Sequence, residues 1–315
     1  MVDNYYEKLL RTAVLYYSEE LTQQEVAQRM GVSRQAVNKY LAEAKEKGII
    51  EFKINNPIET NKKLEKYLRD KYKLKAAVIA SGHYYNEDVL RYLIAQKAVD
   101  VLKPLLIKEC RRVALSWGRT VYALINQFPD KEIYSDSEIL PLFGTSDNTA
   151  PYFMINELVR VFAEKIHGTP RFIYLPVSPA DREDYNHYIK TRAYTNAMDY
   201  WKNIDLAVIG IGDMTKNSSN RSPYPGEDLI WEELGGCHIV GDICAKYFDK
   251  GGRFFSCEHG DMLLSIPLED LKNVKMVVAM AGGNSKVKSI KGALLTNIID
   301  VLITDEQTAS YLAAS

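Results

Sequence analysis

The chain has 315 residues, of which 46% are hydrophobic and 26% charged, and a formal net charge of −1 at pH 7. This composition is typical of a globular protein with a sizeable core, and the length suits one large domain and one small one. The near-zero charge excludes a uniformly basic nucleic-acid coat protein, so we expect any DNA contact to come from a local patch.

Near the N-terminus, the segment LTQQEVAQRMGVSRQAVNKYLAEAKEKGII predicts two short helices joined by a tight turn. Thr22 and Glu25 have the spacing of a capping box, which satisfies free N–H groups at a helix start. Gly31 can adopt the left-handed conformation that a tight turn needs. Ala27 before the turn is small and Val37 after it is branched, so the two helices can cross closely, as in a helix-turn-helix.

The second of these helices is predicted to read DNA. Its polar side chains face outward near the end that enters the major groove, where Arg and Lys bind guanine or phosphate and Gln and Asn bind adenine. The stretch GIIEFKIN that follows resembles a short wing, and its lysine is available to a phosphate. We therefore predict a winged helix-turn-helix domain over residues 1–56, with DNA contacts from Ser33, Arg34, Gln35, Asn38, Lys39 and Lys53.

The basic charge of this domain is concentrated on the predicted DNA-reading segment. Residues 29–47 carry five basic and two acidic side chains, whereas residues 1–56 carry eight of each. Because non-specific DNA affinity comes from neutralising phosphates, one copy of a net-neutral domain should bind weakly. Tight binding to an operator is therefore expected to need two or more copies of the chain.

After the turn-forming sequence Asn55-Asn56-Pro57, residues 57–74 are predicted to form a linker helix and residues 75–315 a second domain. In this domain helical stretches, such as 88–107 and 152–167, alternate with short and almost entirely apolar runs, as expected for strands covered on both faces. The alternation indicates an α/β fold with a doubly wound, mostly parallel sheet. The predicted strands are Ala76–Ala80, Val113–Trp117, Ile139–Phe143, Phe172–Leu175, Leu206–Ile209, Met276–Ala279 and Val301–Thr304.

Glycine-containing turns follow several of these strands, at the sheet edge where open α/β folds bind ligands. Gly118, Arg119 and Thr120 open a helix, and helix starts, hydroxyls and guanidinium groups suit a phosphate. Lys286 begins another helix, where a lysine opposes the helix dipole and so indicates an anionic partner. The polar segment 215–228 is expected to cover the ligand. The predicted contacts are Gly118, Arg119, Thr120, Gly144, Thr145, Asn156, Gly212, Asp213, Asp242 and Lys286.

In their order and spacing these motifs resemble the SorC family of sugar-binding transcriptional regulators, which includes DeoR-type deoxyribonucleoside regulators. The resemblance implies an effector domain similar in fold to ribose-phosphate isomerase and glucosamine-phosphate deaminase, which binds a phosphorylated sugar or polyol. It also implies a dimer or tetramer whose operator affinity changes with the effector, and it points to Lys286 as a phosphate contact. Besides the helix-turn-helix, it rests on SWGRT (Ser116–Thr120), LPLFGT (Leu140–Thr145), VIGIGD (Val208–Asp213), GDICAKYFDKGG (Gly241–Gly252), AMAGGNSK (Ala279–Lys286) and VLITDEQTA (Val301–Ala309).

Two other function classes remain open at this point. The first is an enzyme, namely a sugar-phosphate isomerase or an aminosugar-phosphate deaminase. The sequence contains no HExxH, G-x-S-x-G or P-loop motif, but acids and histidines near several strand ends leave a catalytic pair open. The helix-turn-helix argues against an enzyme. The second is an interaction protein that uses its N-terminal helices only to dimerise, which a DNA-binding assay distinguishes.

Hydropathy and cysteine usage predict a cytoplasmic protein with no membrane partner. No apolar run approaches the ~20 residues that cross a bilayer, and the acidic N-terminus is not typical of a secretory signal. The four cysteines show no CxxC spacing, so reduced thiols are expected. A zinc site from Cys237, His238, Cys257 and His259 lacks the usual ligand spacing, so we expect no metal and no other cofactor.

Overall fold

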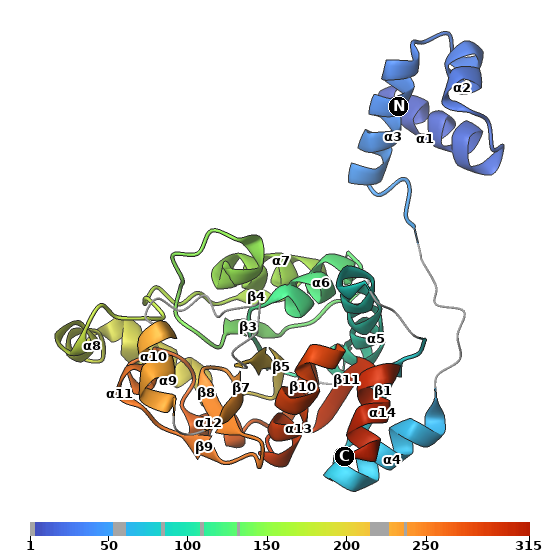
Figure 1. Ribbon diagram of the computed structural model, residues 1–315. Coiled ribbons are helices and arrows are strands. Elements are labelled where there is room, and N and C mark those ends of the chain that lie inside the picture. Colours follow the sequence, from blue (N-terminus) through green and yellow to red (C-terminus); the bar gives the residue numbers. More distant parts are fainter. Residues whose placement is uncertain are drawn as a thin grey trace. The chain divides into compact units, whose positions relative to one another are not determined.

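The computed structural model describes residues 4–52, 61–82, 86–107, 110–130, 133–214, 227–235 and 238–315. The chain forms two compact units, Met1–Pro57 and Ile58–Ser315 (Figure 1). Each unit has a hydrophobic core of its own.

The first unit is a helical domain with the predicted helix-turn-helix. Thr22 caps the first of the two helices in a capping box with Glu25, and Ser33 caps the second by accepting the N–H of Ala36. Gly31 between them is left-handed, with φ of 66°. Val26, Ala27, Val37 and Leu41 are buried together with Leu15 in one small core. The elements are α1 (Asn4–Ala13), a π-helical turn (Val14–Ser18), α2 (Gln23–Met30) and α3 (Arg34–Glu46).

The described part of the predicted wing contains no strand. Residues 48–50 form a turn and a bend and residues 51–52 are irregular, and Phe52 packs edge-on against Tyr17 at 5.1 Å between ring centroids. Lys53, the predicted phosphate contact of the wing, lies outside the described residues, as does the remainder of the wing.

The second unit is built on a parallel sheet of seven strands in the order β1-β11-β10-β5-β2-β3-β4. Helices pack on both faces, with α5, α6 and α7 on one side and α13 and α14 on the other (Figure 1). This confirms the predicted doubly wound α/β fold. The strands are β1 (Ala76–Ala80), β2 (Arg112–Leu115), β3 (Glu138–Pro141), β4 (Thr169–Pro170), β5 (Leu206–Gly210), β10 (Met276–Met280) and β11 (Val301–Asp305).

The helices of this unit have the following bounds, as far as the described residues go. They are α4 (Lys62–Tyr72), α5 (Glu87–Ile107), α6 (Arg119–Gln127), η2 (Pro151–Phe153), α7 (Ile155–Ile166), α8 (Arg182–Tyr188), α9 (Arg192–Trp201), α10 (Glu227–Leu234), α11 (Glu258–Asp261), α12 (Leu268–Lys272), η3 (Asn284–Lys286), α13 (Val287–Leu295) and α14 (Glu306–Ala314), where η denotes a 3-10 helix.

One predicted strand, Phe172–Leu175, is wrong. The seventh strand of the sheet is instead the two-residue β4, and residues 171–175 continue as an irregular segment. The amide side chain of Asn156 on α7 accepts the N–H of Ile173 at 3.3 Å and donates to its carbonyl oxygen at 2.9 Å. These backbone groups are therefore satisfied by a side chain, so no further strand pairing is needed.

A second, antiparallel sheet adjoins the first and was not predicted. Its four strands are β6 (Gly212–Asp213), β7 (Ile239–Ile243), β8 (Lys246–Asp249) and β9 (Phe254–Phe255), in sequential order. The two-residue turn between β7 and β8 places Cys244 and Ala245 at φ of 50° and 60°. Such left-handed pairs are the usual hairpin turn geometry, but Gly or Asn normally occupies them, so the sequence gives no turn signal there.

The helix α4, inside the predicted linker, packs in the second unit against the edge strand β1 and against α14. The carboxylate of Glu65 on α4, only 8% exposed, accepts the N–H of Ile79 in β1 at 3.0 Å. It thereby occupies a backbone donor that an edge strand would otherwise present to another chain.

Candidate effector cavity and DNA-reading helix

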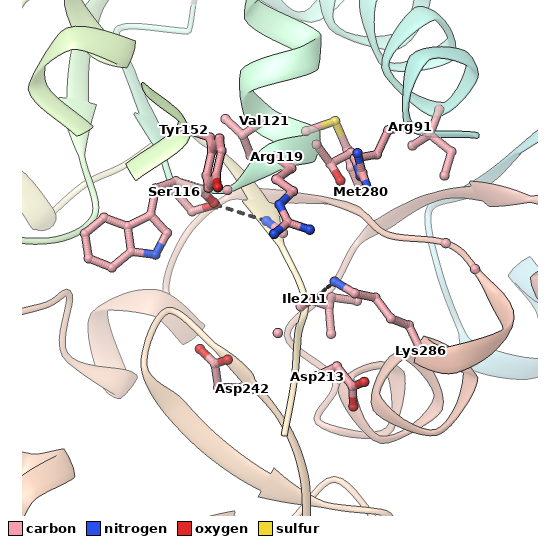
Figure 2. Close-up of a pocket in the computed structure, with 18 of the residues that line it drawn as sticks. Arg91, Ser116, Arg119, Val121, Tyr152, Ile211, Asp213, Asp242, Met280 and Lys286 are labelled. Atoms are coloured by element: carbon pink, nitrogen blue, oxygen red, sulfur yellow. Dashed lines mark hydrogen bonds between the residues drawn. The ribbon is translucent and has the colours of Figure 1, made fainter. Parts of the chain in front are cut away.

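A cavity of 360 Å³ opens beyond the carboxyl ends of β2, β5 and β10 and beside the second sheet. Arg119 and Lys286 point toward its centre, and the carboxylates of Asp213 and Asp242 lie below them (Figure 2). The volume suits a small metabolite, and the position is where ligands of open α/β sheets bind.

The start of α6 forms one wall of the cavity. Gly118, at φ of 120°, donates its N–H to the carbonyl oxygen of Tyr152 at 2.8 Å, so the chain turns sharply from β2 into the helix. The Arg119 guanidinium lies 5.4 Å from the centre of the Tyr152 ring. Since Thr120 also lines the cavity, a helix N-terminus, a guanidinium and a hydroxyl converge there, a combination suited to an anion.

Lys286 approaches from the opposite wall, and its ammonium group donates to the carbonyl oxygen of Ile211 at 3.0 Å. Burial lowers the pKa of Lys286, while the nearby carboxylates of Asp213 and Asp242 oppose this shift. Asp213 is itself held by the Ser289 hydroxyl at 3.0 Å. The lysine is thus a desolvated cation, partly balanced by two acids on its inner side.

Asp242 lies at the floor of the cavity and is 9% exposed. Burial raises the pKa of Asp242 to about 6. The N–H of Ala245 and the charges of Lys286 and Lys246 act to lower this pKa but do not outweigh burial. A Cβ at Gly212 would lie 1.8 Å from the Asp242 carboxylate, so any larger residue there would have to displace this carboxylate. A carboxyl group poised near neutral pH both accepts and donates hydrogen bonds, as recognition of hydroxyl groups requires.

Seven of the ten predicted contacts line this cavity, and three do not. Gly144 lies so close to the backbone of Leu175 and Pro176 that a Cβ would clash with it. The Thr145 hydroxyl donates to the carbonyl oxygen of Leu175. Asn156 bonds Ile173, as described above. These three residues hold the irregular segment 171–176 beside the sheet. The predicted contacts that do line the cavity are Gly118, Arg119, Thr120, Gly212, Asp213, Asp242 and Lys286.

Sequence reasoning missed an aromatic wall and a charged helix face. The Trp117 and Phe143 rings stack 4.3 Å apart, and Phe153 meets Trp117 edge-on. The first two rings stand directly before Gly118 and Gly144, so their place at strand ends was a usable signal. Glu87 and Arg91 line the cavity from the first turns of α5. They form an ion pair at 2.9 Å, and nothing in their sequence setting distinguishes them from surface residues.

The predicted cover, 215–228, lies outside the described residues apart from the backbone of its last two.

In the first unit the predicted reading side chains lie on one exposed face of α3 and the turn before it. Arg34 is exposed and 3.4 Å from the Gln23 amide, and Lys39 forms a loose 3.7 Å ion pair with Glu43. Neither contact is strong, so both cations remain available to an external partner. The exposed predicted contacts are Ser33, Arg34, Gln35, Asn38 and Lys39.

The described residues form neither a metal site nor a membrane-spanning helix. In the described ranges, no three His, Cys, Asp or Glu side chains gather as a metal site would require; Cys237 of the zinc alternative is not among them. None of the helices described above is long and apolar enough to cross a membrane.

Comparison with known proteins defines the class. Residues 56–314 match the family model described as "Putative sugar-binding domain", and residues 13–56 match the MarR family model. The chain therefore belongs to the family of regulators that join this sugar-binding domain to a helix-turn-helix. Together with the similarities below, this identifies it as a member of the SorC family.

Individual relatives match over almost the whole length. The sorbitol operon regulator of Klebsiella pneumoniae is 26% identical over 96% of both chains. The deoxyribonucleoside regulator of Bacillus subtilis is 28% identical, again over 96% of both. The crystal structure of the full-length sorbitol operon regulator SorC from Klebsiella pneumoniae has a TM-score of 0.75 at 25% identity, covering 99% of this chain and all of that one.

Proposed function

We propose that this protein is a DNA-binding regulator of carbohydrate metabolism whose operator affinity is controlled by a phosphorylated sugar or polyol bound in the cavity. The supporting observation is the pairing, in one chain, of an exposed DNA-reading helix with a separate cavity. The cavity offers cations and a helix start at one side and buried carboxylates at the other. Regulation is the role of the protein in this proposal, and catalysis is not part of it.

The two sides of the cavity suit the two parts of such an effector. The α6 start, Arg119 and Lys286 favour a phosphate, because charge-assisted hydrogen bonds in a partly buried site are strong. Asp242 and Asp213 suit sugar hydroxyl groups, and the stacked rings of Trp117 and Phe143 offer an apolar surface to the carbon skeleton. An unphosphorylated sugar would bring no anionic group to these cations.

Homo-oligomerisation is part of the proposal, because one net-neutral DNA-binding domain should bind weakly. An exposed apolar stripe on α1 and the π-helical turn supports it, with exposed fractions of 47% for Tyr6, 50% for Leu10, 42% for Val14 and 36% for Tyr17. Two copies packed antiparallel along this stripe would bury it. Sedimentation should therefore give a mass at least twice the 35.8 kDa of one chain, and a monomer bound to operator DNA would contradict this part of the proposal.

Replacing Lys286 by alanine is expected to weaken effector binding by roughly 1.5–3 kcal/mol, the range for hydrogen bonds to charged groups. Calorimetry would measure this after a thermal-shift screen of phosphorylated pentoses, hexoses and hexitols, each beside its unphosphorylated form. Lys288→Ala is the matched control, because it removes an exposed lysine from α13, the helix whose N-cap is Lys286.

Three outcomes of these measurements would count against the proposed function. Unchanged affinity in Lys286→Ala would remove Lys286 from the site. Equal binding of the unphosphorylated sugars would contradict a phosphorylated effector. Turnover of ribose 5-phosphate or glucosamine 6-phosphate by the purified protein would favour the enzyme alternative.

A further inference from the structure

Asp305 fixes the loop that carries Lys286. Its carboxylate is 2% exposed, accepts the N–H of Gly283 at 2.8 Å, and caps α14 by accepting the N–H of Thr308 at 2.8 Å. The Thr308 hydroxyl also accepts the Gly283 N–H, at 3.0 Å. A Cβ at Gly282 would come within 2.4 Å of the same carboxylate, so the loop lies directly against it. Hydrogen bonds to a buried carboxylate are short and strong, so loop and helix are expected to move together.

The connection from this loop to the effector site is short. The N–H of Lys286 donates to the Gly283 carbonyl oxygen at 3.0 Å, which closes the single turn of η3. The Lys286 ammonium group donates to the carbonyl oxygen of Ile211 and keeps two further N–H donors for an effector anion. We expect an anion that draws on Lys286 to shift η3, and the tight turn joins this shift to Gly283 and so to Asp305.

Glu306, the next residue, connects the same end of α14 to the start of α4. One carboxylate oxygen accepts the N–H of Gly82, which follows β1, at 2.8 Å. The other accepts the side-chain amide of Asn61 at 3.3 Å. Asn61 is the N-cap of α4, because its own side-chain oxygen accepts the N–H of Leu64. Glu306 thus binds the N-cap residue of α4.

The far ends of the two helices are bound as well. The Lys71 ammonium group donates to the carbonyl oxygens of Leu312 and Ala313 at 3.0 and 3.1 Å, and the Tyr72 hydroxyl donates to Leu312 at 3.0 Å. α4 and α14 therefore run side by side in the same direction and are joined at both ends (Figure 1). A shift of α14 is expected to carry α4 with it.

From these contacts we propose that α14 transmits effector binding to α4, with Asp305 positioning the Lys286 loop and Glu306 joining α14 to the N-terminus of α4. The proposal rests on the proposed function, since it assumes that an effector changes operator affinity. It assigns separate consequences to two adjacent acids. Loss of Asp305 disturbs the effector loop, whereas loss of Glu306 leaves both binding sites intact and weakens the coupling between them.

The test compares Glu306→Ala with Gln307→Ala, a neighbouring substitution on the same helix. Three constants are measured for the full chain: the effector Kd by calorimetry, the operator Kd alone, and the operator Kd with saturating effector. In Glu306→Ala the first two should equal the wild-type values, while the ratio of the two operator Kd values falls toward 1 from a wild-type coupling typically of ~5- to 150-fold. Gln307→Ala should keep the wild-type ratio.

A second variant tests the loop. Asp305→Asn keeps an acceptor for Thr308 but turns an amide donor toward the Gly283 N–H, so effector affinity should fall by about tenfold or more. Its operator affinity without effector should stay at the wild-type value, with circular dichroism confirming the fold. An unchanged coupling ratio in Glu306→Ala, or loss of effector binding in that variant, would overturn the proposal. If the wild-type protein itself shows no effector response, the proposed function fails instead.

Discussion

Replacement of both Arg34 and Asn38 by alanine is expected to abolish specific operator binding while the protein stays folded. Each good bidentate contact between a side chain and a base contributes ~1–3 kcal/mol of discrimination, so the double variant loses two of them. The fold should survive, because both side chains are exposed and the helix is anchored in its core by Val37 and Leu41. Fluorescence anisotropy on an operator selected from random duplexes with the wild-type protein would measure the loss.

Two single substitutions separate base reading from simple charge effects. Lys8→Ala removes one positive charge, as the loss of Arg34 does, but from an exposed position on α1. It should leave operator affinity almost unchanged. Lys39→Ala should weaken binding to all sequences alike and reduce the slope of log K against log salt by about 1, if this lysine contacts a phosphate. Specific affinity retained in the Arg34→Ala, Asn38→Ala double variant would refute the assignment of α3 as the reading helix.

The features predictable from sequence were those that depend on local chemistry. A capping box, a glycine in the left-handed region and the burial of Val37 are set by neighbouring residues, so the helix-turn-helix was predicted element by element. Six parallel strands were also predicted near their observed positions, because strands covered on both faces are continuous apolar runs. The glycines that follow these strands led to Gly118, Arg119 and Lys286 in the cavity.

The missed features depend on hydrogen bonds between side chains and backbone groups. The run Phe172–Leu175 is as apolar as the true strands, and only the side chain of Asn156 shows why it forms no ladder. The second sheet rests on a hairpin with Cys244 and Ala245 in its turn, residues that carry no turn preference. Its turn is held by the Ala245 N–H, which donates at 3.1 Å to the carboxylate of Asp242, three residues earlier in the same hairpin. The pattern of hydrophobic residues in the sequence does not indicate such a contact.

Substitution of Asp242 by asparagine is expected to stabilise the effector-free protein at pH 7–8 while weakening effector binding. Burial raises the pKa of Asp242 to about 6 in the folded state, above the unfolded value of about 3.9. The folded state therefore prefers the protonated acid, and ionisation costs stability progressively as pH rises through this window. Above pH 6 the cost of ionising Asp242 is reached in full, and for a pKa shift of about two units it is roughly 3 kcal/mol at most. The neutral amide of asparagine should remove this cost.

Urea unfolding at several pH values would show this as a gain in Asp242→Asn that shrinks toward zero as pH falls to about 4. Asp249→Asn on the adjacent strand is the matched control with the opposite sign. Partial burial acts to raise the pKa of Asp249, but the N–H groups of Arg253 and Gly251 hold it below its usual range, so its ionised form stabilises the fold. That variant should lose stability at neutral pH. A wild-type protein as stable as Asp242→Asn at pH 8 would show that the buried carboxyl group carries no cost, and the argument that it is kept there to recognise the effector would fail with it.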